Sequence, residues 1–583
     1  MRGQGRSRPR FLHPLPRCVR PPPGSMRSSP RASPSAAFLA VLFLGAASAC
    51  MDLDVTNVNE PDYKRALATA GDVEALIKAS YNSWFFATQA YEDSFYKGTP
   101  GFFLSNQAFM NAPPWANWGM DEYGRIPRIA IHTDVTWAYY PVQTHAWEGC
   151  YRALSALAEG LKALDDPDVA QMISDADMIR NRAYGKFVQG LAHGTVALLY
   201  ARGFILDETT DFEKAQDPVD YDVLMERALT YFDAAIELAS SQPFALPFDW
   251  MQAELDSPGL GRLAHAYKAR LRAQVARTPE ERQAVDWGAV MAEVDAGLQA
   301  THTINMDWNA GWESLVLGTS THFGFNQLPY FIYGMADQSG AVAEWYTLPP
   351  TVEEAGGEPA KRHLLPDGRP VLIVTSDLRF PQGSTVEEQR ANQGPYVRII
   401  TASEAEGALS TWVRPDRGVW RWSWYKAGPA MGRDYYELSK FEQAEMPLAE
   451  ARLLKAEGLY RTGDLAGAAA IVNETRTVAG LNATDASGAN TSCVPRLPDG
   501  SCGDLWEMLK WEKRMETAFR GIVSSGWFFD SRGWGDLWKD TPLQMPIPCS
   551  ELETLRLTPC PTFGGPGGEM SAQVSTYDFP FER

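Results

Sequence analysis

The chain has 583 residues, of which 45% are hydrophobic and 11% aromatic, with 19 tryptophans among them. This length is enough for one large core or two fused lobes, and large flat rings in such number can fill a core or line a ligand site. The formal net charge of −19 argues against nucleic acid as a partner and against docking to anionic lipid through a basic patch.

The first 49 residues are predicted to be a leader that the mature protein lacks. They contain eight arginines and no acidic residue, so the rest of the chain keeps 45 basic and 72 acidic residues and a net charge of −27. Residues 1–25 are rich in Arg and Pro, and Met26 is the better start, because it opens an export signal whose apolar run spans 36–47. That run is too short to span a bilayer.

The apolar run ends in Ala47-Ser48-Ala49-Cys50, with small residues directly before a cysteine. A lipoprotein signal peptidase needs this pattern, since its site must admit the backbone next to a lipid-modified thiol. We therefore predict that Cys50 carries a lipid; the alternative is ordinary cleavage after Ala49 with a free Cys50. No other stretch of the sequence reaches transmembrane length, so the lipid would be the sole anchor.

The rest of the chain has mostly helical periodicity. Apolar residues recur at helical spacing, as Val73, Ile77 and Trp84 do in the first such segment. The predicted helices span 71–87, 146–164, 176–202, 220–239, 262–276, 286–300, 445–462, 465–478 and 503–520.

Some of the predicted helices pair with their neighbours. Within 450–475, Gly458 lets two helices approach closely, Gly463 can take the left-handed cap of the first helix, and Asp464 can cap the second. This segment resembles a tetratricopeptide helix pair. Further pairs are predicted from 182–202 with 220–239 and within 262–300, and a fourth would have to use 146–164.

Two regions, 91–135 and 301–440, lose the helical period and are rich in Gly, Pro, Trp and Tyr. We predict long ordered loops there, with short strands at Val371–Thr375 and Tyr396–Thr401. The expected fold class is mainly α, with tetratricopeptide-like helix pairs as a scaffold, long irregular loops and a few short strands. Loops of this length in a compact domain usually carry function.

Two pairs of cysteines are expected to form disulfides, Cys493 with Cys502 and Cys549 with Cys560. Each pair flanks a short loop, and an exported protein can keep disulfides. Neither pair has Cys-x-x-Cys spacing or a nearby His, which argues against zinc. Cys150 lies inside a helical pattern and is expected to be a buried thiol.

Motifs for catalysis and cofactor binding are absent from the sequence. It contains no His-Glu-x-x-His, no Gly-x-Ser-x-Gly, no Gly-x-x-x-x-Gly-Lys and no dinucleotide fingerprint. Acidic residues are abundant, but unpaired carboxylates do not indicate a glycosidase, and Asp165-Asp166-Pro167-Asp168 lacks the remaining ligands of a calcium loop. We therefore expect no enzymatic activity, no cofactor and no metal site.

The ligand is expected on the aromatic loops, since stacked helix pairs bury their apolar faces against each other. Side chains at 91–135 and 301–350 fall outside any clear helical stripe, and flat rings there can stack on a sugar while polar groups bond its rim. The alternative is that these rings hold the loops down on the scaffold. The candidate ligand-binding residues are Trp115, Trp118, Asp121, Tyr123, Trp308, Trp312 and Trp345.

Several passages, taken in their order and spacing, resemble the SusD/RagB family of outer-membrane nutrient-binding lipoproteins. The resemblance covers nearly the whole mature chain, and the passages that carry it are Leu53–Asn57, Asp72–Ile77, Trp147–Leu161, Glu450–Leu481, Glu512–Glu516 and Phe529–Gly535. One departure is Arg520-Gly521, where the family tends to have Glu-Gly and soon after it an Arg.

The resemblance implies a single domain at 50–583, with a helical scaffold at 60–300 and 441–540 and a loop-rich region at 301–440. It also implies four tetratricopeptide-like units, a lipid anchor at the outer face of the outer membrane, and a SusC-type TonB-dependent transporter as partner. The ligand would be a glycan or a peptide. A surface glycan-degrading enzyme and a protein–protein interaction scaffold remain alternatives.

Overall fold

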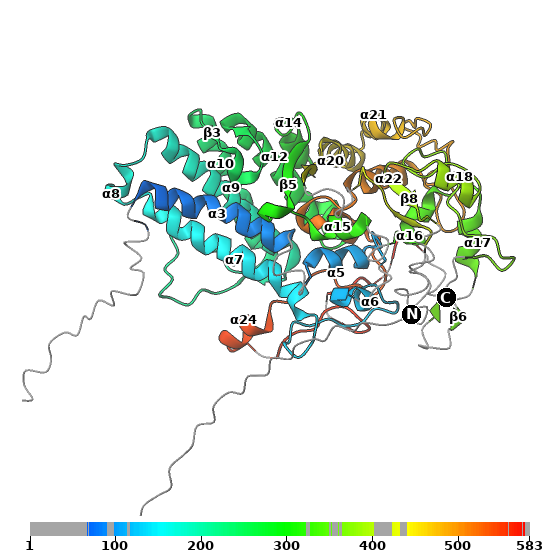
Figure 1. Cartoon of the computed structure of the whole chain (residues 1–583), viewed down its shortest axis with the longest axis horizontal. Coiled ribbons are helices and arrows are strands. Elements are labelled where there is room, and N and C mark those ends of the chain that lie inside the picture. The colour runs from blue at the N-terminus through cyan, green and yellow to red at the C-terminus, as the bar shows by residue number, and fades with distance from the viewer. Residues whose placement is uncertain are drawn as a thin grey trace, which may run out of the picture. The chain divides into compact units, whose positions relative to one another are not determined.

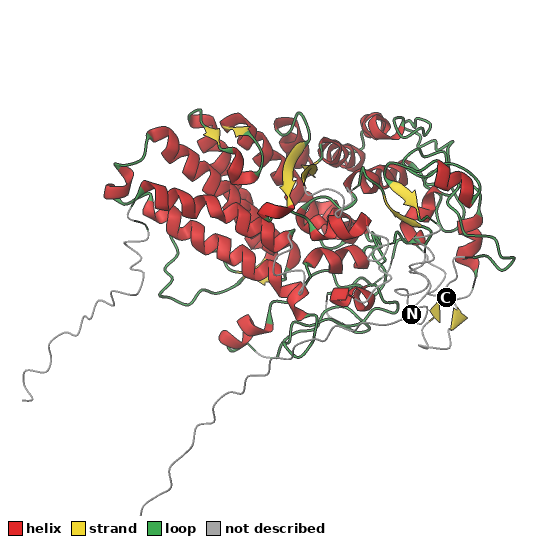
Figure 2. Ribbon diagram, in the orientation of Figure 1, coloured by secondary structure: helices red, strands yellow, loops and turns green. Residues whose placement is uncertain are grey.

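Helices make up most of the computed structural model, and the strands are short, which confirms the mainly α fold class (Figure 2). All described residues belong to one compact unit, Tyr63–Arg583. The leader and Cys50 lie outside the described residues. The structure describes residues 67, 69–89, 98–112, 117–321, 327–348, 351–352, 359–360, 364–401, 423–431, 440–557, 559–568, 570–573 and 575–577.

The first helix pair is α3 (Ala70–Thr88) with α7 (Tyr140–Ala163), which lie side by side (Figure 1). Glycine makes the close approach possible, because a Cβ at Gly149 would lie 2.0 Å from the Cβ of Ala87. The helix predicted at 146–164 therefore packs against the helix predicted at 71–87.

Three further pairs follow the predicted segments. They are α9 (Asp175–Leu199) with α10 (Tyr221–Ser241), α12 (Ser257–Gln274) with α14 (Trp287–Ala296), and α20 (Leu448–Arg461) with α21 (Leu465–Arg476). In the last pair Gly463 is left-handed with φ +93°, and the Asp464 side chain accepts a hydrogen bond from the Gly467 N–H, as the sequence predicts.

Shorter helices connect and cover these pairs. The described ones are α5 (Pro100–Gln107), η1 (Asn117–Gly119), α6 (Met120–Tyr123), α8 (Pro167–Ala170), α11 (Phe248–Met251), α13 (Pro279–Ala284), η2 (Trp308–Ala310), α15 (Leu315–Thr321), α16 (Tyr330–Tyr333), η3 (Gly334–Ala336), α17 (Ala341–Thr347), α18 (Val386–Ala391), α22 (Leu505–Thr517), η7 (Ile522–Ser524), α23 (Gly526–Trp534) and α24 (Cys549–Thr554). The regions 91–135 and 301–440 thus contain more helix than predicted.

The strands form antiparallel pairs rather than a larger sheet. The pairs are β1 (Arg202–Gly203) with β2 (Val219–Asp220), β3 (Ala245–Leu246) with β4 (Leu255–Asp256), β5 (His302–Asp307) with β10 (Lys440–Met446), β6 (Thr351–Val352) with β7 (Pro359–Ala360), and β8 (Val397–Ile399) with β9 (Tyr425–Ala427).

One predicted strand, Val371–Thr375, is wrong, and the strand predicted at Tyr396–Thr401 is shorter than expected. In this segment, side chains form hydrogen bonds with backbone groups that would bond to a neighbouring strand in a sheet. The Ile373 N–H donates to the Tyr425 hydroxyl at 2.7 Å, and the Val374 N–H donates to Asp337 Oδ1 at 3.0 Å. The backbone N–H groups of Ile373 and Val374 are therefore hydrogen-bonded although the segment belongs to no sheet.

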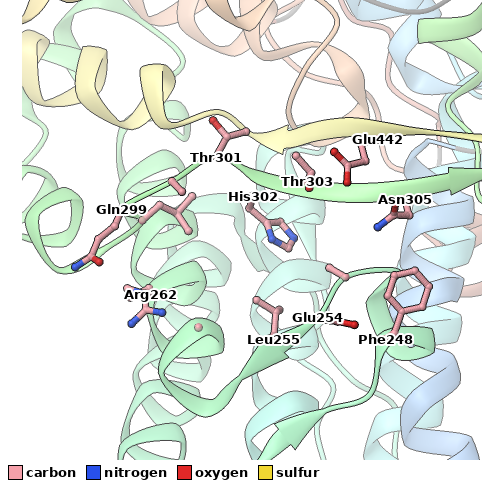
Figure 3. A pocket seen from close by; sticks show the side chains of 14 residues that line it. Phe248, Glu254, Leu255, Arg262, Gln299, Thr301, His302, Thr303, Asn305 and Glu442 are labelled. Carbon is pink, nitrogen blue, oxygen red and sulfur yellow. The ribbon is translucent and has the colours of Figure 1, made fainter.

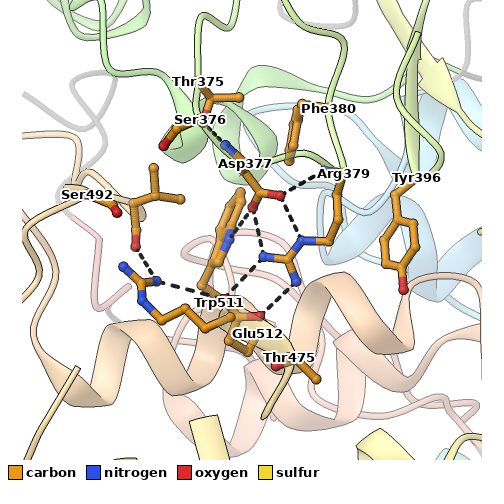
Figure 4. A network of polar contacts seen from close by, with 12 residues as sticks. Thr375, Ser376, Asp377, Arg379, Phe380, Tyr396, Thr475, Ser492, Trp511 and Glu512 are labelled. Atoms are coloured by element: carbon orange, nitrogen blue, oxygen red, sulfur yellow. Dashed lines mark hydrogen bonds and ion pairs between the residues drawn. The ribbon is translucent and has the colours of Figure 1, made fainter. Parts of the chain in front are cut away.

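Helix α22 carries a network of buried ion pairs (Figure 4). Arg379 lies between Asp377, at 2.7 Å, and Glu512, at 2.8 Å, and all three side chains are almost fully buried. The Trp511 indole N–H donates to the same Asp377 carboxylate at 3.1 Å. The loop that contains Asp377 is thereby held on α22.

The next residues of α22 extend this network toward the scaffold helices. Lys513 lies 2.9 Å from Asp530 on α23, and Arg282 on α13 bonds both Asp530, at 3.0 Å, and Glu457 on α20, at 2.7 Å. All of these groups are buried, so each charge depends on its partners. The passages 512–516 and 529–535 are two of those on which the family resemblance rests. They therefore supply buried ion pairs that link α22 and α23 to the scaffold helices.

The structure joins Cys493 to Cys502, with 4.7 Å between their Cα atoms, and Cys549 to Cys560, with 5.5 Å. Cys150 is a buried free thiol on α7. Within the described ranges, no helix combines the length and the apolar character needed to cross a membrane.

We expect Arg379→Met to lower the free energy of unfolding by about 3–5 kcal/mol, because it leaves Asp377 buried without a cation and Glu512 with only the more distant Arg476, at 3.8 Å. Urea unfolding followed by circular dichroism measures this. Arg369→Met is the matched control, since Arg369 pairs with Asp367 at the surface, and that variant should unfold close to wild type. Equal effects of the two substitutions would contradict the role given to the network.

The stability of the protein should also depend on pH through Glu457. Burial opposes its ionisation, but the charges of Arg282, Lys513 and Arg461 outweigh burial and lower its pKa from 4.5 to about 2. Because the folded pKa is the lower one, this carboxylate contributes about 3 kcal/mol above pH 4.5, which is lost as the pH falls toward 2.

Glu457→Gln should therefore flatten the fall of unfolding free energy across this pH window, as measured by urea unfolding at a series of pH values. The exposed Glu237→Gln should keep the wild-type slope. If the slope of Glu457→Gln matched that of wild type, Glu457 would not be the titrating group.

Candidate functional site

Partly exposed rings gather in the segment that leads from η1 to α7. We call Trp118, His132, Trp137 and Tyr139 the aromatic surface. Trp137 lies 5.2 Å from His132 and 6.1 Å from Tyr139 between ring centroids, and it meets the Tyr139 ring edge to face. All four rings are partly exposed. Rings at right angles to one another can enclose a flat ligand from two sides.

Backbone geometry places Trp118 in this surface. Its φ of 55° is left-handed, and the following Gly119 is left-handed as well, with φ 75°. The Trp118 ring stacks on Phe102 of α5, with 4.7 Å between centroids and 2° between planes. A Cβ at Gly119 would lie 2.6 Å from the ring of Tyr139, so only glycine lets this ring lie against the backbone.

Tyr123 supports the aromatic surface from beneath. Its ring is fully buried and meets Trp137 edge to face at 6.0 Å. Its hydroxyl donates to the Tyr139 carbonyl at 3.2 Å, and its own carbonyl accepts from Arg128 at 2.9 Å. Tyr123 is therefore a positioning residue, which corrects its prediction as a ligand contact.

A carboxylate lies at the edge of the aromatic surface. Asp134 accepts hydrogen bonds from the hydroxyl of Thr136, at 2.6 Å, and from its N–H, at 2.8 Å. These bonds lower the pKa of Asp134 below its ordinary value, so the group is ionised at neutral pH. Such a group can accept hydrogen bonds from hydroxyls or amides of a ligand.

Two further predicted contacts are packing residues. Trp312 is 6% exposed, and its ring lies against Tyr81, at 6.1 Å, and Phe85, at 4.9 Å, on α3. Trp345 on α17 is fully buried, 5.1 Å from Tyr330. Both correct the expectation of ligand contacts, because a ring without accessible surface cannot stack on a bound molecule.

Three predicted residues have side chains that lie outside the described residues, namely Trp115, Asp121 and Trp308. Conversely, Trp137 and Tyr139 were not predicted. They follow directly on the loop region at 91–135 and precede Pro141, which stands in the first turn of α7. Their position just before a helix with proline in its first turn is the sequence feature from which they could have been predicted.

Glu445 is a buried acid whose pKa is shifted toward neutrality. Burial raises the pKa of Glu445 to about 7, against the opposing charge of Arg270, and Tyr267 donates a hydrogen bond to it at 3.1 Å. Glu445 is only 1% exposed, so a substrate cannot reach it. In the part of the chain that the structure describes, no group of three or more His, Cys, Asp or Glu is arranged to hold a metal ion.

No family model and no curated protein matches the chain. Solved structures do match it, and many of them are SusD, SusD-like or SusD/RagB proteins of Bacteroides. A SusD superfamily protein of Bacteroides vulgatus is 14% identical, with a TM-score of 0.46 and coverage of 85% of this chain and 98% of that one.

A SusD-like protein of Bacteroides fragilis is 14% identical, with a TM-score of 0.48 and coverage of 86% and 98%. A third structure, a laminarin-binding SusD-like protein, is also 14% identical, with a TM-score of 0.46 and coverage of 83% and 97%.

Proposed function

We propose that the protein is a surface lipoprotein that binds a nutrient, a glycan or a peptide, and delivers it to a SusC-type TonB-dependent transporter in the outer membrane. The export signal before Cys50 and the order of the SusD/RagB-like passages support the location and the partner. The observation that carries ligand binding is the aromatic surface, in which the partly exposed rings of Trp137 and Tyr139 stand at right angles above the buried Tyr123.

A glycan fits the aromatic surface better than a peptide. The faces of a pyranose are apolar and flat, so they can stack on Trp118 or Trp137, while ring hydroxyls donate to Asp134. The aromatic surface need not become ordered when the ligand binds, since Tyr123 and Phe102 already pack against its rings.

Two other functions would give different results. A surface glycan-degrading enzyme would release shorter products from a polysaccharide that it binds. An interaction scaffold would bind proteins only. Binding to a panel of polysaccharides that includes laminarin, followed by product analysis of each one bound, separates binding from hydrolysis. A pull-down that recovers only proteins, with no glycan or peptide ligand bound, would favour the scaffold.

Trp118→Ala should weaken binding of a retained polysaccharide by about tenfold or more, because a ring that stacks on a ligand is worth about 2 kcal/mol. Affinity electrophoresis measures the change, and the melting temperature should fall little, since the ring is partly exposed.

Trp506→Ala is the matched control, because Trp506 is also partly exposed but lies on α22, where it packs against Tyr460. Its affinity should equal that of wild type. A large fall in melting temperature of Trp118→Ala, or an unchanged affinity, would mean that Trp118 only holds its loop in place.

Cys50→Ala should release the protein from the membrane fraction, because the lipid on Cys50 is the proposed anchor. Fractionation of cells that express the full chain measures this, and Cys150→Ala serves as the control that keeps the anchor. A Cys50→Ala protein that still sediments with membranes would place the anchor elsewhere.

A further inference from the structure

A pocket of about 600 Å³ lies between the β5–β10 pair and the chain around β4 (Figure 3). We call it the β5 pocket. Its volume is within the range of small-ligand sites. It is separate from the aromatic surface, with which it shares no residue. The side chains used below are Arg262, Glu254, Glu442, Thr303, Asn305 and His302.

The strand pair sets the polar wall of the β5 pocket. Asn305 stands directly opposite Glu442 in the antiparallel register, so their side chains share one face, and Thr303 is on that face two residues along. The Asn305 N–H and its side-chain nitrogen both donate to the Gln252 carbonyl, at 2.9 and 3.2 Å. This leaves Asn305 Oδ1 to accept a hydrogen bond from a ligand.

Charged side chains of both signs line the pocket. Within the described residues, neither Arg262 nor Glu254 nor Glu442 makes an ion pair or a side-chain hydrogen bond. Charged groups nearby on the same elements are paired, as Lys78 is with Asp249 and Lys440 with Asp307. Glu254 and Glu442 are exposed and Arg262 is partly exposed, so a ligand in the pocket can reach all three charges.

The opposite charges stand at opposite sides. Figure 3 shows Arg262 close to Gln299 on one side of the pocket, whereas Glu254 and Glu442 lie on the other side, with Asn305 and Phe248. A free ligand with two opposite charges at a distance from each other can meet both sides at once, and a neutral sugar gains nothing from this arrangement.

The middle of the pocket is neutral. His302 is 8% exposed, and burial, with a further contribution from the charge of Arg270, lowers its pKa to about 4, so its ring is uncharged at pH 7. Leu255 and Leu298 add apolar surface, and Phe248 at the rim is 42% exposed. The centre can thus accept uncharged backbone and small apolar side chains.

We propose that the β5 pocket binds a short zwitterionic peptide, with the terminal carboxylate at Arg262 and the terminal ammonium at Glu254 and Glu442. A guanidinium can bond a carboxylate with two parallel hydrogen bonds, and the two carboxylates make the opposite side of the pocket favourable for an ammonium. Thr303 and Asn305 then bond the peptide groups between the two ends. The proposal does not depend on glycan binding at the aromatic surface.

The test is calorimetric titration of the mature protein with trialanine at millimolar concentration and pH 7. Trialanine should bind, whereas N-acetylated trialanine and trialanine amide should each bind about tenfold more weakly, because each lacks one terminal charge. No binding of trialanine, or equal binding of the three peptides, would overturn the proposal.

Substitutions test which side of the β5 pocket binds each terminus of the peptide. In Arg262→Gln, trialanine and its amide should bind equally weakly; in the double variant Glu254→Gln, Glu442→Gln, trialanine and its acetylated form should do so. Arg398→Gln, a partly exposed arginine outside the pocket, and the exposed Glu226→Gln are matched controls that should bind trialanine as wild type does. A loss of binding in the controls, or its retention in the pocket variants, would place the peptide elsewhere.

The result is distinguishable from that of the glycan experiment. Trp118→Ala should leave trialanine binding unchanged, and Arg262→Gln should leave polysaccharide binding unchanged. Loss of trialanine binding in Trp118→Ala would contradict two separate sites and would therefore overturn the β5 pocket as the peptide site.

Discussion

The requirement that buried charges be paired governs this structure more than any other single constraint. Lys510, Lys513 and Arg514 on α22 are all buried, and their partners Asp530 and Asp536 come from one neighbouring segment. Removing one member would leave a charge in a medium that cannot solvate it. The ion pairs of α22 therefore hold the helix pairs, α23 and the loop at 377–379 in the arrangement that brings these charges together.

This rigid centre explains why candidate binding features lie at its margins. The apolar faces of the scaffold helices pack against each other, and charged groups of α22 and α23 form buried ion pairs. Among the accessible features of the described residues are the aromatic surface, with rings and one carboxylate, and the β5 pocket, with separated opposite charges. The two differ in chemistry, so a glycan and a short peptide would not compete for one place.

The sequence predicted the scaffold well because helical periodicity is local. The spacing of Val73, Ile77 and Trp84 indicates α3, and Gly463-Asp464 indicates the turn between α20 and α21. It predicted strands less well, since Val371–Thr375 has a suitable apolar run but pairs its backbone with the side chains of Tyr425 and Asp337. Whether an extended segment has a neighbouring strand depends on distant parts of the chain.

The sequence alone thus determined the mainly α class and the helix pairs, and it predicts the export signal and the family resemblance, because each follows from spacing or order along the chain. Only the tertiary structure decided which aromatic residues are accessible. Trp118 and Trp345 both occur in regions without clear helical period, yet one stays partly exposed on Phe102 and the other is fully buried against Tyr330. Burial depends on what packs from elsewhere in the chain, and a sequence pattern contains no record of those contacts.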